Sequence, residues 1–231
     1  MEESKDVGKM YYITIATKPH KVLEKIKSTV LKNGETIIVL GTQENRTIGW
    51  EAKVNFGVKL REVADFLKRP DLKDNDILLF TDAYDVAYCG TQKEILRRYK
   101  TFQKPIVFGC EKGCHPDAER STEYKELDRE FPFLNSGLFI GRVKELRECM
   151  ANYEYDDTHD DQRFWTTQFL NHPDKIELDY ENYIFLNTVD MDMDSFIHDN
   201  RNNQVFYKWR NPQFVHINGP VKKMIEQFLN T

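Results

Sequence analysis

The sequence DILLFTDAYDV, residues 76–86, sets the architecture that we expect for this chain. Ile77–Phe80 is an apolar run with polar residues on either side, which is typical of a strand buried on both faces of a sheet. Asp82 and Asp85 follow where this strand should end. In open α/β sheets the ligand binds beyond the carboxyl ends of the strands, so both carboxylates should face whatever the protein binds.

The spacing of Asp82 and Asp85 suggests a metal site. Two oxygen ligands three positions apart on a turn suit a hard divalent cation that keeps open positions for phosphate oxygens. The same pair also suits an ordinary strand end or helix cap, because aspartate is a common turn residue. Our hypothesis is a metal site for a diphosphate, and a purely structural pair is the alternative.

Strands and helices alternate around this motif. The segments Tyr11–Thr17 and Thr36–Gly41 are rich in β-branched and aromatic residues and predict strands, whereas the apolar spacing of Lys21–Leu31 predicts a helix. A strand, a helix and a strand in this order imply parallel pairing with a right-handed crossover. Similar patterns predict helices at 59–69, 91–102, 143–153, 164–170 and 221–229, and strands at 105–109, 133–141, 183–187 and 214–217. The fold class that we expect is α/β.

Length and composition favour a single domain over residues 1–231, with a flexible N-terminus at residues 1–10. The formal net charge is -5 and no basic block occurs, which argues against a nucleic-acid partner. No apolar run approaches the roughly 18 residues of a membrane span, and the N-terminus is acidic where a signal peptide would be basic. We expect a cytoplasmic protein, or one of the endoplasmic reticulum lumen if the chain is part of a longer secreted protein.

The four cysteines are too few and too irregularly spaced for a disulfide scaffold. Buried free thiols are therefore expected at Cys89, Cys110, Cys114 and Cys149. A disulfide between Cys110 and Cys114, or a zinc site that they form with His115, is the alternative.

Further candidate site residues lie on other predicted elements. Lys59 begins a helix and could reach a phosphate oxygen, although a solvated lysine in the first turn is the simpler interpretation. Asn135 and Ser136 lie in a strand-like run bracketed by glycines, where they could meet sugar hydroxyls or simply form a bulged strand. His216 follows a strand and could complete a metal shell begun by two carboxylates, and Mn²⁺ tolerates one nitrogen among oxygen ligands better than Mg²⁺ does.

Three further segments of the sequence are rich in polar and charged residues. The acidic cluster Asp156–Asp161 precedes a helix, so capping and the helix dipole account for one carboxylate at its N-terminus but not for four acids in six residues. Such crowding is tolerated best where a cation or sugar hydroxyls engage it. Glu111–Arg129 is irregular, and we expect either a flexible active-site flap or an ordered excursion. Asp190–Asp194 is expected to be a solvated loop.

Four motifs, taken in order, resemble the glycosyltransferase domain of the multifunctional procollagen lysyl hydroxylases. They are FTDAYDV at 80–86, FLNSGLFIG at 133–141, DDQ at 160–162 and VHINGP at 215–220. The resemblance extends from about Tyr12 to Lys223, and related collagen and lipopolysaccharide glycosyltransferases share parts of the pattern. It implies a GT-A fold, in which a Rossmann-like, mostly parallel central sheet is flanked by helices.

The resemblance also implies a role for each matching residue. Asp82, Asp85 and His216 match the family's ligands of Mn²⁺. Asp160 and Asp161 match acids implicated in sugar binding or catalysis. The implied binding set for the UDP-sugar comprises Thr17 at the uridine, Lys59 and Asp82 at the diphosphate, Asn135 in a donor-site motif, and the turn residues Asn218, Gly219 and Lys222.

The implied reaction transfers a hexose, in the first place glucose, from a UDP-sugar to galactosyl-hydroxylysine of a collagen-like protein or glycopeptide, with retention of anomeric configuration. The alternatives are a UDP-galactose-dependent hydroxylysine galactosyltransferase, a lipopolysaccharide-type transferase and an inactive nucleotide-sugar-binding module. A phosphohydrolase with Asp82 as nucleophile is disfavoured, because such enzymes usually place their paired acids one residue apart. Lysyl hydroxylation is not expected, since the transferase portion occupies these 231 residues. A homodimer is compatible with this reading.

The chain departs from the family pattern at several positions. An aromatic residue near the uracil is replaced by Asn45, with Trp50 nearby as a substitute. His115 stands before a proline where the family has a tryptophan, and the poly-Asp run is broken by Thr158 and His159. Contacts to the donor and the acceptor are therefore expected to differ from those of the family.

Overall fold

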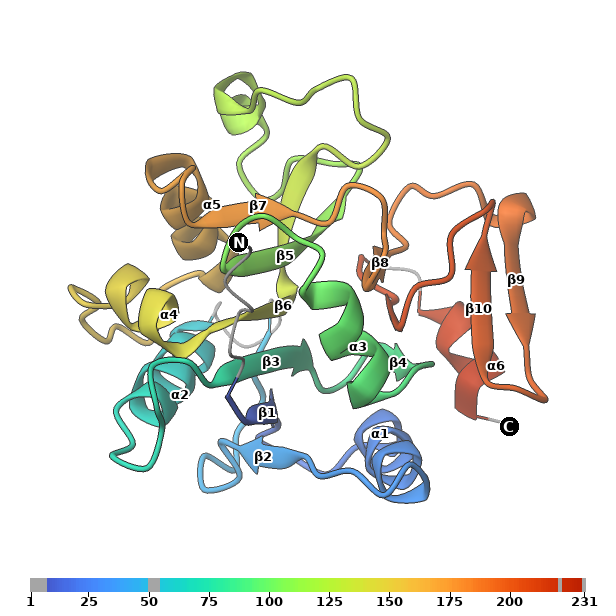
Figure 1. The fold of residues 1–231 in the computed structure, drawn as a ribbon, viewed down its shortest axis with the longest axis horizontal. Coiled ribbons are helices and arrows are strands. Elements are labelled where there is room, and N and C mark those ends of the chain that lie inside the picture. Colours follow the sequence, from blue (N-terminus) through green and yellow to red (C-terminus); the bar gives the residue numbers. More distant parts are fainter. Residues whose placement is uncertain (1–7, 50–54, 220–221, 230–231) are drawn as a thin grey trace, which may run out of the picture.

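A six-stranded sheet forms the centre of the protein, in a computed structural model that describes residues 8–49, 55–219 and 222–229 (Figure 1). The strand order is β2-β1-β3-β6-β5-β7. The strands are β1 (Met10–Ile15), β2 (Ile38–Leu40), β3 (Ile77–Asp82), β5 (Ile106–Glu111), β6 (Phe133–Arg142) and β7 (Ile176–Leu178). β1 runs parallel to β2 and β3, and β5 runs parallel to β7, whereas β6 is antiparallel to both of its neighbours. The expected α/β class with a mostly parallel sheet is confirmed.

The central strand β3 is as buried as its apolar sequence predicts. Its first five residues are buried, and only the last one, Asp82, is partly exposed. Phe80 stacks on Phe139 of β6 with ring centroids 5.0 Å apart, and Phe139 in turn lies 5.3 Å from the ring of Trp165. This aromatic core holds β3 in the middle of the sheet, so the position of its carboxyl end is well determined.

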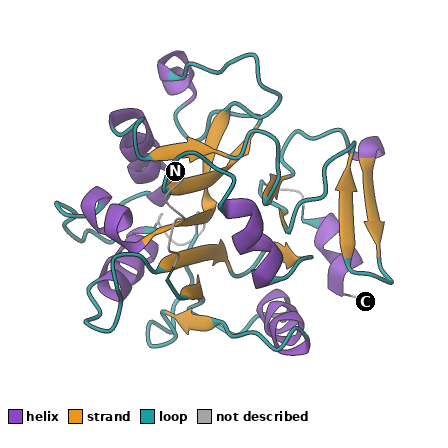
Figure 2. Ribbon diagram, in the orientation of Figure 1, coloured by secondary structure: helices purple, strands orange, loops and turns teal. Residues whose placement is uncertain are grey.

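Helices surround the sheet (Figure 2). They are α1 (Lys21–Lys32), α2 (Gly57–Leu67), α3 (Gln92–Tyr99), α4 (Val143–Cys149) and α5 (Asp161–Asn171). In Figure 1, α2, α4 and α5 gather on the left, while α1 and α3 lie on the right. The apolar stripe of α1 is buried as predicted, and α2 begins two residues earlier than predicted, which places Lys59 inside its first turn. α4 ends at Cys149, before the predicted end at Tyr153, whose ring packs against Phe164.

A second, three-stranded sheet brings the C-terminal part of the chain next to β3. It contains β4 (Val86–Tyr88), β11 (Phe214–His216) and β8 (Phe185–Asn187), with β11 in the middle. His216 pairs with Val86 across an antiparallel register and with Asn187 across a parallel one. The last residue of β11 therefore lies beside the turn that follows β3.

Several C-terminal elements differ from the prediction. The strand β7 and the antiparallel hairpin of β9 (Phe196–Asp199) and β10 (Gln204–Tyr207) were not predicted, because polar residues interrupt their apolar pattern. The predicted C-terminal helix is a 3₁₀ turn, η4 (Lys223–Ile225), followed by the short α6 (Glu226–Leu229). The acidic segment from Asp190 to Asp194 is mostly exposed and leads into the 3₁₀ turn η3 (Met193–Ser195), close to the solvated loop that we expected.

The segment 111–129 is an ordered excursion rather than an open flap. It contains the 3₁₀ helix η2 (Ala118–Glu123) and packs on α5. Arg163 of α5 donates to Asp117 at 2.7 Å, and Arg120 donates to Thr167 at 3.0 Å. Tyr124 is buried, with its ring centroid 5.5 Å from that of Phe169. These contacts hold the excursion at the edge of the sheet.

All four cysteines are free thiols. Cys89, Cys110 and Cys149 are buried, as predicted, whereas Cys114 is partly exposed. The Cys110 thiol faces the carbonyl of Asp179 at 3.1 Å and the Cys114 thiol faces the carbonyl of Asp117 at 3.4 Å. The alternatives of a Cys110–Cys114 disulfide and of a zinc site with His115 are therefore wrong, because the two thiols have separate partners.

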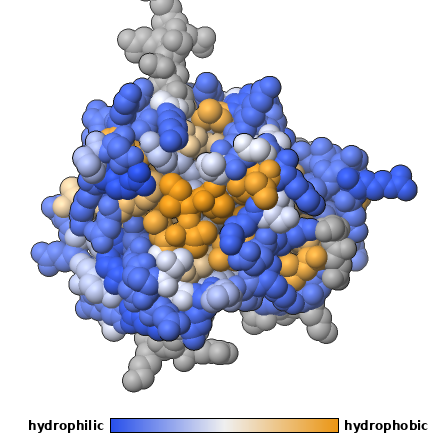
Figure 3. Space-filling model, turned by 90° about the horizontal axis from the view of Figure 1, so that it is seen from below, coloured by the Kyte–Doolittle hydropathy of each residue, from blue (hydrophilic) through white to orange (hydrophobic). Residues whose placement is uncertain are grey.

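The face shown in Figure 3 is largely hydrophilic, with an apolar patch in its middle. The edge strand β2 lies at the bottom of Figure 1, the side from which Figure 3 is viewed, and its three apolar residues are only partly buried. Within the part of the chain that the structure describes, no helix is both long and apolar enough to cross a membrane. Residues 1–7 of the expected flexible N-terminus lie outside the described residues.

Candidate functional site

A cavity of about 800 Å³ lies beyond the carboxyl end of β3. This volume is within the range of small-molecule sites in proteins. Ten of the predicted site residues line it: Lys59, Asp82, Asp85, Asn135, Asp160, Asp161, His216, Asn218, Gly219 and Lys222. Residues that lie far apart in the sequence thus meet in one cavity, as expected for an open α/β sheet.

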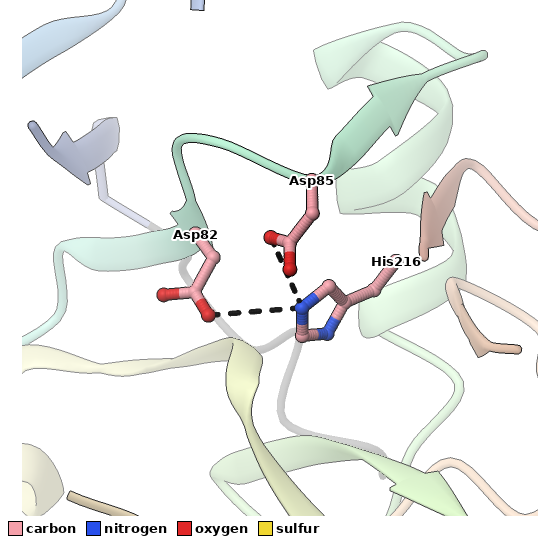
Figure 4. Close-up of side chains that lie close together, drawn as sticks. All are labelled: Asp82, Asp85 and His216. Carbon is pink, nitrogen blue, oxygen red and sulfur yellow. Dashed lines mark ion pairs between the residues drawn. The ribbon is translucent and has the colours of Figure 1, made fainter. Parts of the chain in front are cut away.

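Asp82, Asp85 and His216 converge in this cavity (Figure 4). The Nε2 atom of His216 lies 3.3 Å from Oδ1 of Asp85 and 3.7 Å from Oδ2 of Asp82. One ligand atom from each residue lies within 4.8 Å of the other two, and the described residues contain no other such group of three. The pairing of β11 with β4 causes this convergence, and the amide of Ile217 donates to the Asp85 carbonyl at 2.8 Å.

The surroundings of these three side chains fit a divalent cation. Two carboxylates and one imidazole form a donor set that suits a divalent cation. Gly137 of β6 faces them, and a Cβ atom on this glycine would lie only 2.8 Å from Oδ2 of Asp82 and 2.9 Å from Nδ1 of His216. The absence of a side chain at position 137 therefore leaves room for the triad to close on an ion.

Two lysines neutralise the two aspartates. Nζ of Lys59 lies 2.7 Å from Oδ1 of Asp82, and Nζ of Lys222 lies 2.6 Å from Oδ2 of Asp85. Burial by itself would lower the pKa of Lys59, but the charges of Asp161 and Asp82 outweigh it and raise that pKa. Burial would likewise raise the pKa of Asp85, but its contacts with His216 and Lys222 lower it. The simpler interpretation of Lys59 as a solvated charge is wrong, because its side chain is only 15% exposed.

The acidic cluster separates into structural and cavity residues. Asp156 accepts hydrogen bonds from the amide and the hydroxyl of Thr158, and Asp157 binds the guanidinium of Arg46 through two contacts of 2.6 and 2.8 Å. Neither of these acids lines the cavity. Local partners thus engage Asp156 and Asp157, and only Asp160 and Asp161 are placed to meet a cation or a sugar in the cavity.

Asp160 and Asp161 do line the cavity, in different states. Oδ1 of Asp160 caps α5 by accepting from the amide of Arg163 at 3.0 Å, which confirms the predicted cap. Its Oδ2 is buried without a hydrogen-bond partner, and burial raises the pKa of this carboxyl. Asp161, in contrast, accepts from Ser136 Oγ at 2.9 Å and faces Lys59 at 3.3 Å. The two acids thus differ in their partners, since Oδ2 of Asp160 has none whereas Oδ2 of Asp161 has two.

Among the other residues that line the cavity are Glu111 and Tyr84, which the sequence did not single out as site residues. Glu111 is buried at the end of β5, accepts from Nδ2 of Asn218 at 2.6 Å, and has its pKa raised to about 7 by burial. It was missed because β5 extends two residues beyond the predicted strand. Tyr84 lies within the DILLFTDAYDV motif, and its hydroxyl accepts from the amides of Thr17 and Lys18 at 2.8 and 3.0 Å. A polar residue at the carboxyl end of a strand was the available signal in both cases.

Thr17 does not line the cavity. Its backbone amide donates a hydrogen bond to the hydroxyl of Tyr84, and Tyr84 does line the cavity. Its predicted contact with uridine stays a prediction. Asn45 is exposed, with a φ of 44°. Trp50, the suggested substitute for the aromatic residue near the uracil, lies outside the described residues. His115, which stands before a proline, lines the cavity.

Comparisons with known proteins find relatives that match nearly the whole of this chain. "Uncharacterized protein R699" of Acanthamoeba polyphaga mimivirus is 32% identical over 97% of this chain, which spans 50% of that protein. "Multifunctional procollagen lysine hydroxylase and glycosyltransferase" of Caenorhabditis elegans is 27% identical over 97% of the chain, which spans 32% of it. The chain therefore spans at most half the length of these relatives.

Similarity to a solved structure supports the fold. A glycosyltransferase involved in the glycosylation of the major capsid of PBCV-1 superimposes with a TM-score of 0.51 over 96% of this chain and 99% of that one, at 10% sequence identity. The family model of the PLOD GT domain matches residues 6–231. Because this match covers nearly the whole sequence, the chain belongs to the PLOD glycosyltransferase-domain family.

Proposed function

We propose that this chain is a Mn²⁺-dependent transferase that moves a glucosyl group from UDP-glucose to a hydroxyl acceptor, with galactosyl-hydroxylysine of a collagen-like protein as that acceptor. Membership of the glycosyltransferase family supports the reaction class. The name of the Caenorhabditis elegans relative, which couples procollagen lysine hydroxylase with glycosyltransferase, supports the choice of acceptor. The observation that carries the proposal is the convergence of Asp82, Asp85 and His216 beside two lysines in one cavity.

The diphosphate of the donor would lie at this end of the cavity. A divalent cation held by Asp82, Asp85 and His216 would offset the negative charge that develops on UDP as the glycosidic bond breaks. Lys59 and Lys222 line the same cavity, so their ammonium groups are available to phosphate oxygens. The same ammonium groups pair with Asp82 and Asp85 and hold the two carboxylates in place.

The sugar would lie toward the N-terminus of α5. Because Oδ2 of Asp160 is buried without a partner, it is suited to accept a hydrogen bond from a sugar hydroxyl or from the acceptor. Asp161 is already engaged by Ser136 and Lys59, so we assign it the positioning of that lysine. With these roles we propose retention of the anomeric configuration, Asp160 being the carboxylate that faces the reacting sugar.

The donor and the acceptor can be identified by one screen. UDP release is measured with UDP-glucose and with UDP-galactose, with and without Mn²⁺ and with and without a galactosyl-hydroxylysine glycopeptide. Release from UDP-glucose that depends on both Mn²⁺ and the glycopeptide is the expected result. Preference for UDP-galactose with hydroxylysine, or for a saccharide acceptor, would replace the acceptor proposed here, and saturable UDP-sugar binding without release would indicate an inactive binding module.

The role of Asp160 is tested with a matched pair of variants. Asp160→Asn retains the helix cap, since asparagine caps as well as aspartate, but it removes the charge from the cavity. Asp156→Asn makes the same change in the exposed acid that bonds only to Thr158. We expect a loss in kcat of about 100-fold or more for the first variant and near-normal kcat for the second. Equal activities of the two variants, or UDP release unchanged in Asp82→Ala, would contradict the proposal.

A further inference from the structure

Asn187 is a buried polar residue directly behind the cavity. It is the last residue of β8, and its exposed fraction is 0%. It does not line the cavity, so it is not a residue that touches a substrate. Its partner in the parallel register is His216, and its Oδ1 lies 2.8 Å from Nδ1 of that imidazole. Asn187 therefore contacts the side of the imidazole that faces away from Asp82 and Asp85.

The orientation of the Asn187 amide is determined by its other partner. Nδ2 of Asn187 donates to the carbonyl oxygen of Cys110 at 3.0 Å. A carbonyl oxygen can only accept, so the amide nitrogen must face Cys110 and the amide oxygen must face His216. The site is also tightly enclosed, because a Cβ atom on Gly109 would come within 2.9 Å of Nδ2. A flipped amide would place two oxygens against each other in a buried space.

The orientation of the amide in turn determines the tautomer of His216. Because Oδ1 of Asn187 accepts only, Nδ1 of the imidazole must carry a proton. Oδ1 of Asn135, which accepts from the amide of Gly137 at 3.0 Å, faces the same Nδ1 at 3.2 Å and is likewise an acceptor. In the neutral ring the lone pair is therefore on Nε2, the atom that lies 3.3 Å from Asp85.

We infer that Asn187 is a positioning residue that holds His216 in the Nδ1–H tautomer, so that Nε2 is presented to a divalent cation. This inference rests on the cation site of the proposed function. Metal-binding histidines are oriented by a hydrogen bond to their second nitrogen, and loss of such a partner typically weakens metal affinity 10–100-fold. The buried position of Asn187 explains how a residue without access to substrate controls the site.

Two variants at position 187 separate the acceptor from the shape of the side chain. Asn187→Leu has a similar size but no acceptor. Asn187→Asp keeps an acceptor oxygen beside Nδ1, but its second oxygen replaces Nδ2 opposite the Cys110 carbonyl, so this variant is expected to be less stable. Leu186→Ala is the matched control, since Leu186 is equally buried on the same strand but pairs with Val215 instead of His216. The control loosens β8 without removing the hydrogen bond to the imidazole.

The readouts are the ¹⁵N shifts of the imidazole nitrogens in the metal-free full chain, and the Kd for Mn²⁺ alone measured by titration calorimetry. We expect Nδ1 to carry a proton in the wild type, in Asn187→Asp and in Leu186→Ala. We expect Asn187→Leu to populate the Nε2–H tautomer and to bind Mn²⁺ 10–100-fold more weakly, whereas the other two variants bind it within threefold of the wild type.

Each outcome bears on the inference. An unchanged tautomer and unchanged Mn²⁺ affinity in Asn187→Leu would overturn it, and so would an equal loss of affinity in Leu186→Ala. If Asn187→Leu does not fold, Asn187→Asp decides, because a shift of its ring proton to Nε2 would overturn the inference and retention of Nδ1–H would support it. A wild type that shows the Nδ1–H tautomer but binds no Mn²⁺ would contradict the proposed function and leave the tautomer assignment standing.

Discussion

Replacement of Gly137 by alanine should strongly weaken cation binding while the fold is retained. Gly137 does not need a positive φ, so alanine can adopt its backbone conformation. The added Cβ would lie 2.8 Å from Oδ2 of Asp82 and 2.9 Å from Nδ1 of His216, and closer still to Cε1 of that ring. Non-bonded contacts of carbon normally begin near about 3.5 Å, so the methyl group overlaps its neighbours by roughly 0.6 Å or more.

The triad can relieve this overlap only by moving apart. Asn187 holds the imidazole from behind at 2.8 Å, so His216 cannot retreat, and Asp82 must turn away. Metal–ligand distances tolerate deviations of only about 0.2 Å. We therefore expect the affinity for Mn²⁺ to fall about 100-fold or more, which is about 2.7 kcal/mol. Overpacking should reduce the free energy of unfolding by about 1–3 kcal/mol.

Titration calorimetry with Mn²⁺ and thermal unfolding of the same samples test this reasoning. Gly141→Ala is the matched control, because it lies on the same strand and its Cβ would meet Ile106 at 3.1 Å and Leu146 at 3.3 Å, away from the cavity. The control should lose stability but keep its Mn²⁺ affinity. A folded Gly137→Ala protein that binds Mn²⁺ within threefold of the wild type would refute the argument.

Three further predictions concern Glu111, Lys59 and Cys114. Burial raises the pKa of Glu111 from 4.5 to about 7. Between these two pH values the folded state binds more protons than the unfolded state, so the free energy of unfolding falls by about 3 kcal/mol as the pH rises from 4.5 to 7. Relative to the wild type, the free energy of unfolding of Glu111→Gln should therefore increase by about that amount between pH 4.5 and 8, as measured by urea titration in the presence of a chelator. Parallel pH profiles of unfolding free energy for the two proteins would contradict this. Lys59→Met removes the buried ammonium group that pairs with Asp82 and Asp161, and it should lower the free energy of unfolding by about 3–5 kcal/mol. The affinity of this variant for Mn²⁺ should not decrease. Urea titration and calorimetry check both effects, and unchanged stability would refute the first. Cys114 is the one cysteine whose side chain is partly exposed, so a thiol reagent should react with the native protein at this residue first. Rapid labelling of native Cys114→Ser would contradict the burial of the other three thiols.

Local sequence patterns predicted much of the fold. The apolar run before Asp82 predicted a buried strand, and the spacing of Val22, Ile26 and Val30 predicted the buried face of α1. These elements were predictable because burial imposes a period of two or 3.6 residues on neighbouring positions. The hairpin of β9 and β10 lacks such a pattern, since its stability depends on contacts with the rest of the chain.

The candidate site was predicted in part. Asp82 and Asp85 were apparent from a carboxylate pair after a strand, and Asp160 from its place at a helix start. The buried state of Lys59 was not, because its partners Asp82 and Asp161 lie on other elements. Asn187 carried no sequence signal, since a single asparagine at a strand end is common.

The sequence by itself determined the order of most strands and helices, the carboxylates that follow β3 and the resemblance to a family of glycosyltransferases. Only the tertiary structure decided which acids are structural and which face the cavity. Arg46 and Asp157 are 111 positions apart, and Lys59 and Asp161 are 102 positions apart. Hydrogen bonds and ion pairs across such separations form only after the sheets have assembled, and they leave no periodic trace in the sequence.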